Sequence, residues 1–109
     1  LRIFLGESDR HEGIPAYEWI VRKAREQGLA GATVLRGVEG FGAHSRLHTA
    51  KILRLSEDLP IVVEIVDTRE KIEEFLPLVD AAIREGLATL EKVHIRFYRS
   101  GKPPSPPEG

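Results

Sequence analysis

Cysteine and methionine are both absent from this chain of 109 residues. Without cysteine, the protein has no disulfide, no thiolate metal ligand and no cysteine nucleophile, and this suits a reducing compartment. No apolar run reaches the ~18 residues that a transmembrane helix needs, and no charged and then apolar leader precedes the first expected strand. We therefore expect a cytoplasmic protein with no membrane insertion.

An excess of positive or negative charge is also absent from the sequence. Lysine and arginine number 16 against 17 aspartates and glutamates, so the formal net charge is −1. A chain this close to neutrality has no overall field that attracts a polyanion, and nucleic acid is therefore not an expected partner. The length allows one domain with one hydrophobic core.

The first fifth of the chain has the pattern of a strand followed by a helix. Leu1, Ile3 and Leu5 alternate with polar or opposite-facing neighbours, which is the period of a strand. Pro15 suits the first turn of a helix, and Gly28 stands where a left-handed residue is expected after the last turn. Apolar residues recur at helical spacing between these two positions.

Two further strands are expected around a long connection. The first covers residues 32–36, where β-branched side chains favour extended backbone. The second covers residues 61–66, whose nearly continuous apolar character is typical of a strand inside a sheet. Between them, the apolar positions 52–55 fit either a hairpin or a short helix, and periodicity does not separate the two for so short a run.

The second half of the chain predicts a helix and a last strand. Asp67 and Glu70 have the spacing of an N-terminal capping box, and a helical apolar stripe follows. Pro77 lies inside this stripe, so we expect a kink or a break over residues 73–76, and Gly86 is expected to close the helix. Residues 93–97 alternate apolar and polar side chains and predict the last strand.

The expected order is strand, helix, strand, strand, helix, strand. Split βαβ units with right-handed crossovers pack this order as an α+β, ferredoxin-like fold, with a four-stranded antiparallel sheet and two helices on one face. The domain is expected to cover residues 1–99. Residues 100–109 include four prolines and predict a disordered tail, with a proline-rich ligand for a partner as the alternative.

Two helices on one face leave the other face of the sheet uncovered. Phe4, Val62 and Val66 are candidates for that second face. Monomers rarely expose a contiguous apolar patch of more than a few hundred square ångströms, and a closed homo-oligomer is the common way to cover one. We therefore expect association through the open sheet face.

Residues 36–54 carry the most informative stretch. Gly37, Gly40 and Gly42 allow close approach of the backbone to a ligand and can turn N–H groups toward an anion. Four basic residues (36, 46, 51 and 54) stand against the single acidic Glu39 in this stretch. An anion site and a simple hairpin tip both fit, because neither a Walker motif nor a dinucleotide fingerprint is present.

Four segments resemble PII signal proteins and, more closely, the PII-like family catalogued as domain of unknown function 190. They are Ala-Thr-Val-Leu-Arg-Gly-Val-Glu-Gly-Phe-Gly at 32–42, His-Thr-Ala-Lys at 48–51, and Leu-Ser-Glu-Asp-Leu-Pro at 55–60 followed by Glu-Ile-Val-Asp at 64–67. The resemblance implies a ferredoxin-like homotrimer with inward-facing sheets, and ligand sites in the clefts between subunits. It also implies an adenine nucleotide, AMP or ADP, as a possible ligand.

By position, the resemblance implies how such a site is built. The implied nucleotide-binding residues are Arg36, Gly37, Gly40, Phe41, Gly42, Arg46, His48, Thr49, Gly86 and Thr89. The loop over residues 42–58 is then expected to regulate an unidentified protein, such as a transporter or a metabolic enzyme. No required cofactor is implied.

Two departures from the PII pattern shape these expectations. Glu39 stands where PII proteins have a lysine, and a carboxylate repels a triphosphate, so AMP or ADP is expected rather than ATP. Ile52 stands at the position of the modifiable tyrosine, so uridylylation is not expected. No nucleophile elbow or paired-carboxylate pattern is present, and we expect no enzymatic activity.

The alternative function is that of a divalent-metal-binding trimer of the cation-tolerance type. His44 and His48 are four residues apart, and imidazole suits divalent transition metals. A third ligand would come from His11, Glu39 or another subunit. A solvated loop histidine is the simpler interpretation of either residue.

Overall fold

The computed structural model describes residues 1–41, 48–49 and 58–101. Along the chain the elements are β1 (Arg2–Gly6), β2 (Arg10–His11), β3 (Ile14–Pro15), α1 (Ala16–Glu26), β4 (Thr33–Arg36), β5 (Glu39–Gly40), β6 (His48–Thr49), β7 (Pro60–Glu64), α2 (Arg69–Ala82) and β8 (Leu87–Thr89). Strands β2 and β3 pair with each other, and so do β5 and β6.

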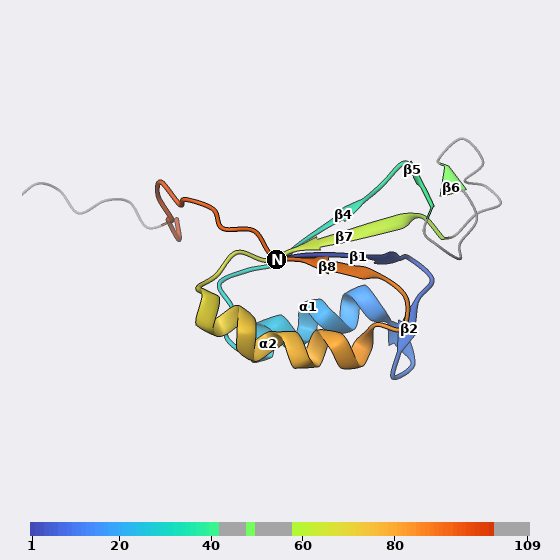
Figure 1. Ribbon diagram of the computed structural model, residues 1–109, viewed down its shortest axis with the longest axis horizontal. Helices are drawn as coiled ribbons and strands as arrows, with labels where there is room; N and C mark the ends of the chain where they lie inside the picture. Colours follow the sequence, from blue (N-terminus) through green and yellow to red (C-terminus); the bar gives the residue numbers. More distant parts are fainter. Residues whose placement is uncertain (42–47, 50–57, 102–109) are drawn as a thin grey trace, which may run out of the picture.

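The remaining strands form one antiparallel sheet in the order β4-β7-β1-β8. Both helices lie on the same face of this sheet, as Figure 1 shows. The predicted α+β, ferredoxin-like architecture is therefore confirmed. No helix of the described residues lies over the opposite face of the sheet.

The core lies between the sheet and the two helices. Ile3 and Val63, neighbours on β1 and β7, have no exposed surface. Ile20 of α1 and Phe75 of α2 pack against the same cluster. The alternation seen in the first strand is confirmed, because Ile3 and Leu5 face this core while Phe4 lies on the other face.

Helix α1 follows its sequence signals closely. Pro15 is the residue before the first turn, and Gly28 has a φ of +75°, the left-handed backbone that glycine adopts without strain. The Glu18 and Arg22 side chains form an ion pair of 3.6 Å on its exposed side. Such a surface pair contributes only about 0.3–0.5 kcal/mol, so burial of the apolar face dominates the stability of this helix.

Helix α2 departs from expectation at both ends and in its middle. Thr68, not Asp67, caps it, and the Thr68 hydroxyl accepts a hydrogen bond of 3.3 Å from the Lys71 N–H. The helix ends at Ala82, before Gly86, and it continues unbroken through Pro77. Phe75 and Val79, on either side of the proline, are both buried in the core, and this packing offsets the hydrogen bond that proline removes.

The last strand was predicted too late in the chain. Strand β8 covers Leu87–Thr89, whereas residues 93–97 form no strand in the described part of the protein. Because α2 ends at Ala82, the chain reaches the free edge of β1 within a few residues, and Leu87 pairs with Phe4 there. The position beside β1 is thus already occupied when residues 93–97 are reached.

Asp67 joins the start of α2 to the loop before β4. Its Oδ2 accepts a hydrogen bond of 2.9 Å from the Ala30 N–H, and its Oδ1 accepts one of 2.7 Å from the Thr68 N–H. Burial acts to raise the pKa of Asp67, but these two hydrogen bonds and the charge of Lys71 outweigh it, and the pKa is lowered. The ionised carboxylate is therefore the form that stabilises the fold.

Replacing Asp67 by asparagine is expected to lower the free energy of unfolding by about 1–3 kcal/mol at neutral pH. A lowered pKa in the folded state means that the carboxylate stabilises the protein above its ordinary pKa of about 3.9, and that this contribution is lost as the pH falls through the folded value. Urea unfolding at neutral pH and at about pH 2 tests this, because the difference from wild type should shrink in acid. Asp80→Asn, on the exposed side of α2, is the control; an equal loss at both pH values contradicts the assignment.

Candidate functional site

The glycine-rich segment lies at one end of the sheet. The register places Gly6 of β1 opposite Pro60 of β7, and Arg36 of β4 opposite Ile61. The end of β1, the start of β7 and the end of β4 therefore meet at this end of the sheet. The Gly37 N–H continues the ladder by donating a 2.7 Å hydrogen bond to the Pro60 carbonyl.

Two of the expected ligand-binding glycines have a packing role at this position. A Cβ atom on Gly37 would lie 2.7 Å from Pro60 Cγ, and one on Gly40 would lie 3.1 Å from the same atom. The chain passes directly over the Pro60 ring, so a side chain at position 37 would clash with it and one at position 40 would require the ring to shift slightly. Their presence in the sequence is thus explained without a ligand.

Replacing Gly37 by alanine is expected to lower the free energy of unfolding by about 1–3 kcal/mol, because the new methyl group overpacks Pro60. Gly31→Ala is the matched control, since a Cβ at Gly31 meets no atom within 4 Å. Denaturant unfolding of both variants without any ligand measures the difference. A Gly37→Ala protein as stable as the control would show that the Pro60 contact imposes no constraint.

Arg36 is the basic residue of the expected site that lies in the described part of the protein, and its side chain already forms an ion pair. Its Nε forms an ion pair with Glu7, whose side chain is only 19% exposed. A guanidinium has five N–H donors, so this contact leaves donors for a second anion. The positive charge at this point is nevertheless shared with a carboxylate.

Two more carboxylates at this end of the sheet bind backbone amides. Asp9 Oδ2 accepts a 2.9 Å hydrogen bond from the Gly6 N–H, and Asp58 Oδ1 accepts one of 2.9 Å from the Ser8 N–H. These contacts fold the chain that follows β1 back onto the start of β7. Of the four basic residues that predict an excess of positive charge over residues 36–54, Arg46, Lys51 and Arg54 lie outside the described residues, so that prediction stays untested.

The structure brings several predicted site residues together at this end. Gly40 pairs with His48 and Glu39 with Thr49 in the β5-β6 ladder, and Phe41 follows with 77% of its surface exposed. Gly42, His44 and Arg46 lie outside the described residues. The metal-binding alternative depends on His44 and on the His48 side chain, and it therefore stays untested. Within the described ranges, no group of three His, Asp or Glu side chains is placed to hold a metal ion.

Gly86 and Thr89 lie at the β8 edge of the sheet, whereas Gly37 follows β4 at the opposite edge. A Cβ on Gly86 would lie 2.6 Å from the Phe4 carbonyl oxygen, so this glycine too is required by packing. Thr89 pairs with Arg2 on β8. Strands β7 and β1 separate β8 from β4, and at ~4.8 Å per strand the two edges are about 14 Å apart. One chain therefore does not bring Thr89 to Gly37.

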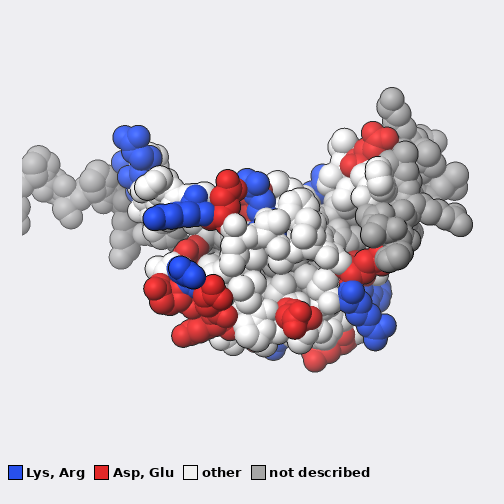
Figure 2. Space-filling view, viewed as in Figure 1, with Lys and Arg blue, Asp and Glu red and all other residues white. Residues whose placement is uncertain are grey.

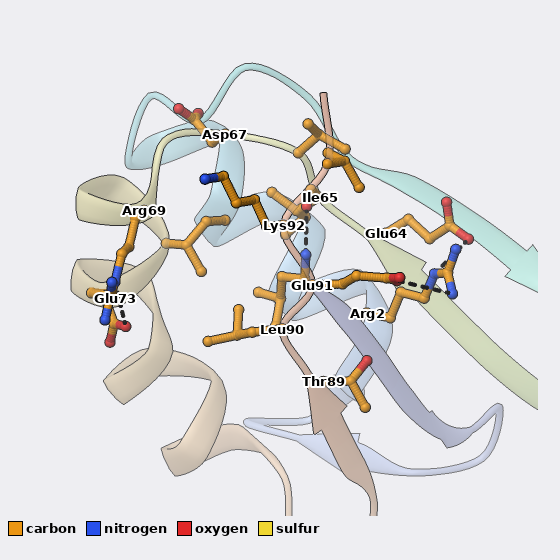
Figure 3. A pocket seen from close by; sticks show the side chains of 14 residues that line it. Arg2, Glu64, Ile65, Asp67, Arg69, Glu73, Thr89, Leu90, Glu91 and Lys92 are labelled. Carbon is orange, nitrogen blue, oxygen red and sulfur yellow. Dashed lines mark hydrogen bonds and ion pairs between the residues drawn. The ribbon is translucent and has the colours of Figure 1, made fainter. Parts of the chain in front are cut away.

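A cavity of about 690 Å³ lies beside Thr89, where the start of α2 meets the chain that leaves β8 (Figure 3). Its walls carry three cations and four carboxylates, which are Arg2, Arg69, Lys92, Glu64, Asp67, Glu73 and Glu91. Arg2 forms ion pairs of 3.5 Å with Glu64 and 3.9 Å with Glu91. With its charges nearly balanced and partly paired, this cavity does not favour a polyanion.

Sequence reasoning missed this cavity. Its walls come from the first residues of the chain, the end of β7, the start of α2 and the residues after β8. No local motif marks it, because only the antiparallel pairing of β1 with β7 and β8 brings these segments to one end of the sheet.

The uncovered face of the sheet carries an apolar row that crosses all four strands. The register aligns Leu35, Val62, Phe4 and Leu87 side by side, on the face opposite Ile3 and Val63. Leu35 is 47% exposed, Phe4 36% and Leu87 57%. The prediction that Phe4 and Val62 share the open face is confirmed. None of the helices in the described ranges is long and apolar enough to span a membrane.

Comparison with known proteins places residues 1–95 within one family profile, DUF190, described as "Uncharacterized ACR, COG1993". The chain is 42% identical over 97 residues to a "UPF0166 protein" of Aquifex aeolicus (strain VF5), with 89% of this chain and 91% of that protein covered. A second "UPF0166 protein" of that organism is 36% identical over 92 residues, covering 84% and 85%. The "UPF0166 protein MJ1524" of Methanocaldococcus jannaschii is 35% identical over 96 residues, covering 87% and 88%.

Proposed function

Because the chain belongs to the DUF190 family, we propose that it is a PII-like regulatory protein of the cytoplasm. In this proposal it is a non-catalytic homotrimer that binds a small anionic ligand, AMP or ADP, between its subunits. It then regulates a protein partner, such as a transporter or a metabolic enzyme, through the loop over residues 42–58.

The apolar row on the open sheet face carries this proposal. Leu35, Val62, Phe4 and Leu87 form one strip across the sheet, with no element of the described chain above it. Contiguous apolar surface of this kind marks an interaction site, and a second copy of the same chain is its usual cover. A trimer with inward-facing sheets buries the strip in every subunit.

The separation of the two groups of expected site residues supports a site between subunits. Gly37 follows β4 at one edge of the sheet, whereas Gly86 and Thr89 belong to the β8 edge. In a ring of identical subunits, the β8 side of one copy meets the β4 side of the next. The two groups then face one cleft, although each chain keeps them apart.

The charges at the glycine-rich end favour a ligand of low charge. Arg36 shares its charge with Glu7, and Glu39 lies on β5 close by in the chain. Adding a triphosphate to this environment brings repulsion from two carboxylates. A monophosphate or diphosphate meets less repulsion and still finds free guanidinium donors.

The short β5-β6 ladder supports the regulatory role of the loop. Gly40 pairs with His48 a few residues after Gly37, so residues 48–49 of the loop pair with a strand next to the expected site. A ligand that contacts Arg36 or Gly37 is thereby coupled to the loop by one short ladder. Ligand binding can then shift the relative populations of two conformations of the loop over residues 42–58.

Calorimetric titration with AMP, ADP and ATP tests the ligand. We expect AMP or ADP to bind more tightly than ATP, and Arg36→Gln to weaken binding by about ten- to a hundredfold, since a charge-assisted hydrogen bond contributes about 1.5–3 kcal/mol. Arg22→Gln on the exposed side of α1 is the matched control, with unfolding curves of both variants to confirm folding.

Three results would contradict the proposed ligand. Heat only with copper or zinc ions would favour the metal-binding alternative. No heat with any nucleotide would leave an assembled scaffold without this ligand. Equal affinity of wild type and Arg36→Gln would show that Arg36 does not contact the bound anion.

A further inference from the structure

The chain after β8 has the pattern of a strand without a strand partner. Val93, Ile95 and Phe97 alternate with polar side chains and are 54%, 58% and 70% exposed. This alternation is the reason why residues 93–97 were predicted to be a strand. The segment instead leaves the sheet and projects beyond its end, as Figure 1 shows in orange.

The backbone of this segment has no hydrogen-bond partner among the described residues. Over residues 90–98 the polar contacts to the rest of the domain are made by side chains: Glu91 forms an ion pair of 3.9 Å with Arg2, and the Tyr98 hydroxyl donates a 3.2 Å hydrogen bond to the Ala30 carbonyl. The Arg99 guanidinium lies 4.3 Å from the centre of the Phe97 ring. The N–H and C=O groups of residues 93–97 are therefore free to form a ladder with another strand.

Strand β4 offers a matching edge. It pairs with β7 on one side, no strand of the described residues lies on the other, and all four of its residues are exposed. An exposed edge presents a row of backbone donors and acceptors that templates pairing with another chain. Leu35 of β4 lies at the end of the apolar row, so a strand added here extends that row.

The apolar surface exposed by the segment after β8 is large enough to take part in a protein–protein interface. Leu90, Val93, Ile95, Phe97 and Tyr98 are all at least half exposed, and together they present several hundred square ångströms. This summed area is of the same order as the largest apolar patch of a typical monomer, about 300–600 Å². With the apolar row of the open face it reaches about the 800 Å² per partner of a standard interface.

Helix α2 does not cover this segment within its own chain, although the two carry opposite charges. Figure 2 shows acidic side chains over the first turns of α2 and basic side chains on the segment that follows β8. Lys92, Arg96 and Arg99 make this segment basic, yet among the described residues no ion pair links it to α2. Its apolar side chains stay exposed within a single chain.

We propose that residues 93–97 of one copy add as a strand to the β4 edge of the next copy. This inference rests on the proposed assembly and names the contact that closes it. The segment leaves from the β8 side of one subunit and pairs on the β4 side of another, which is a head-to-tail contact that closes into a ring rather than a two-fold dimer. It also draws Thr89 of one subunit toward Gly37 of its neighbour.

Hydrogen exchange on the full chain tests this pairing, at a concentration where light scattering shows the assembled mass. We expect amides of residues 93–97 to exchange about 100-fold more slowly than in an unstructured peptide, together with the β4 amides that point away from β7. His94→Pro and Ile95→Pro are made in parallel, because adjacent N–H groups point to opposite sides of a strand. At least one should abolish the protection and reduce the assembled mass, whereas Ser100→Pro should change neither.

The outcomes separate this inference from the proposed function. An assembled protein whose residues 93–97 exchange at the unstructured rate overturns the strand pairing and leaves the assembly intact. Protection of residues 93–97 together with the outer amides of β8, instead of β4, overturns the choice of edge. A protein that is monomeric at every concentration overturns the proposed assembly itself, and the pairing with it.

Discussion

Val62→Asp is expected to abolish assembly, so that the mass measured by light scattering falls from that of three chains to that of one. Val62 stands in the middle of the apolar row, between Phe4 and Leu35 on the neighbouring strands. In a single subunit the new carboxylate is hydrated and costs little. Between packed sheets it is buried without a partner, which costs several kcal/mol per subunit, and the contact fails.

Val38→Asp is the matched control for this experiment. Val38 is 71% exposed and lies between β4 and β5, away from the apolar row. It should keep the assembled mass, and both variants should keep the circular dichroism of the wild type. An unchanged mass for Val62→Asp would show that the open face is not the contact surface, and a monomeric wild type would remove the need for one.

Phe75→Ala is expected to lower the free energy of unfolding by about 3–5 kcal/mol. Phe75 is 1% exposed and packs among the side chains of the sheet and both helices. Removing its ring leaves a cavity that the surrounding side chains fill only in part. Since domains of this size are stable by only about 5–15 kcal/mol, the variant should be close to unfolding at ambient temperature.

Phe41→Ala provides the same chemical change at an exposed site. Phe41 keeps 77% of its surface exposed, so its loss should alter stability by less than about 0.5 kcal/mol. Denaturant unfolding of the two variants gives the comparison directly. A small effect at Phe75 would mean that the helices are held to the sheet by something other than the observed core.

Much of the fold was predictable because its signals are local. The alternation of Ile3 and Leu5 reports which face of β1 meets the helices, and Gly28 reports the end of α1 through its left-handed backbone. Each depends on steric or solvation preferences within a few residues of the chain. The uncovered apolar face also followed from the element order, since both helices of this fold lie on one side.

Other features were not predictable because they depend on distant contacts. Pro77 is tolerated inside α2 since Phe75 and Val79 are held by the core, and the sequence around Pro77 carries no sign of that packing. Strand β8 forms at Leu87–Thr89 because the edge of β1 is within reach there. The stronger alternation over residues 93–97 misled the prediction, since a pattern shows that a strand is favourable but not where its partner lies.

The candidate site shows the same division. Gly37 and Gly40 stood out in the sequence as places where the backbone could approach a ligand, and Gly86 as the end of a helix; in the structure all three lie close to other atoms of the chain. Only the folded chain shows that the approaching atoms belong to Pro60 and to the Phe4 backbone. The pairing of Arg36 with Glu7 joins the end of β4 to the residue that follows β1 and leaves no trace in local spacing.

By itself, the sequence determined the class of fold and the faces of its helices and strands, because periodicity and turn chemistry act over a few neighbouring residues. Its short motifs also indicated the family to which the chain belongs. The tertiary structure alone decided which strand closes the sheet, which carboxylate accompanies Arg36, and that Gly37 and Thr89 lie on opposite edges. Those outcomes depend on backbone pairing and packing between segments far apart in the chain, where each contact forms only once the others are in place.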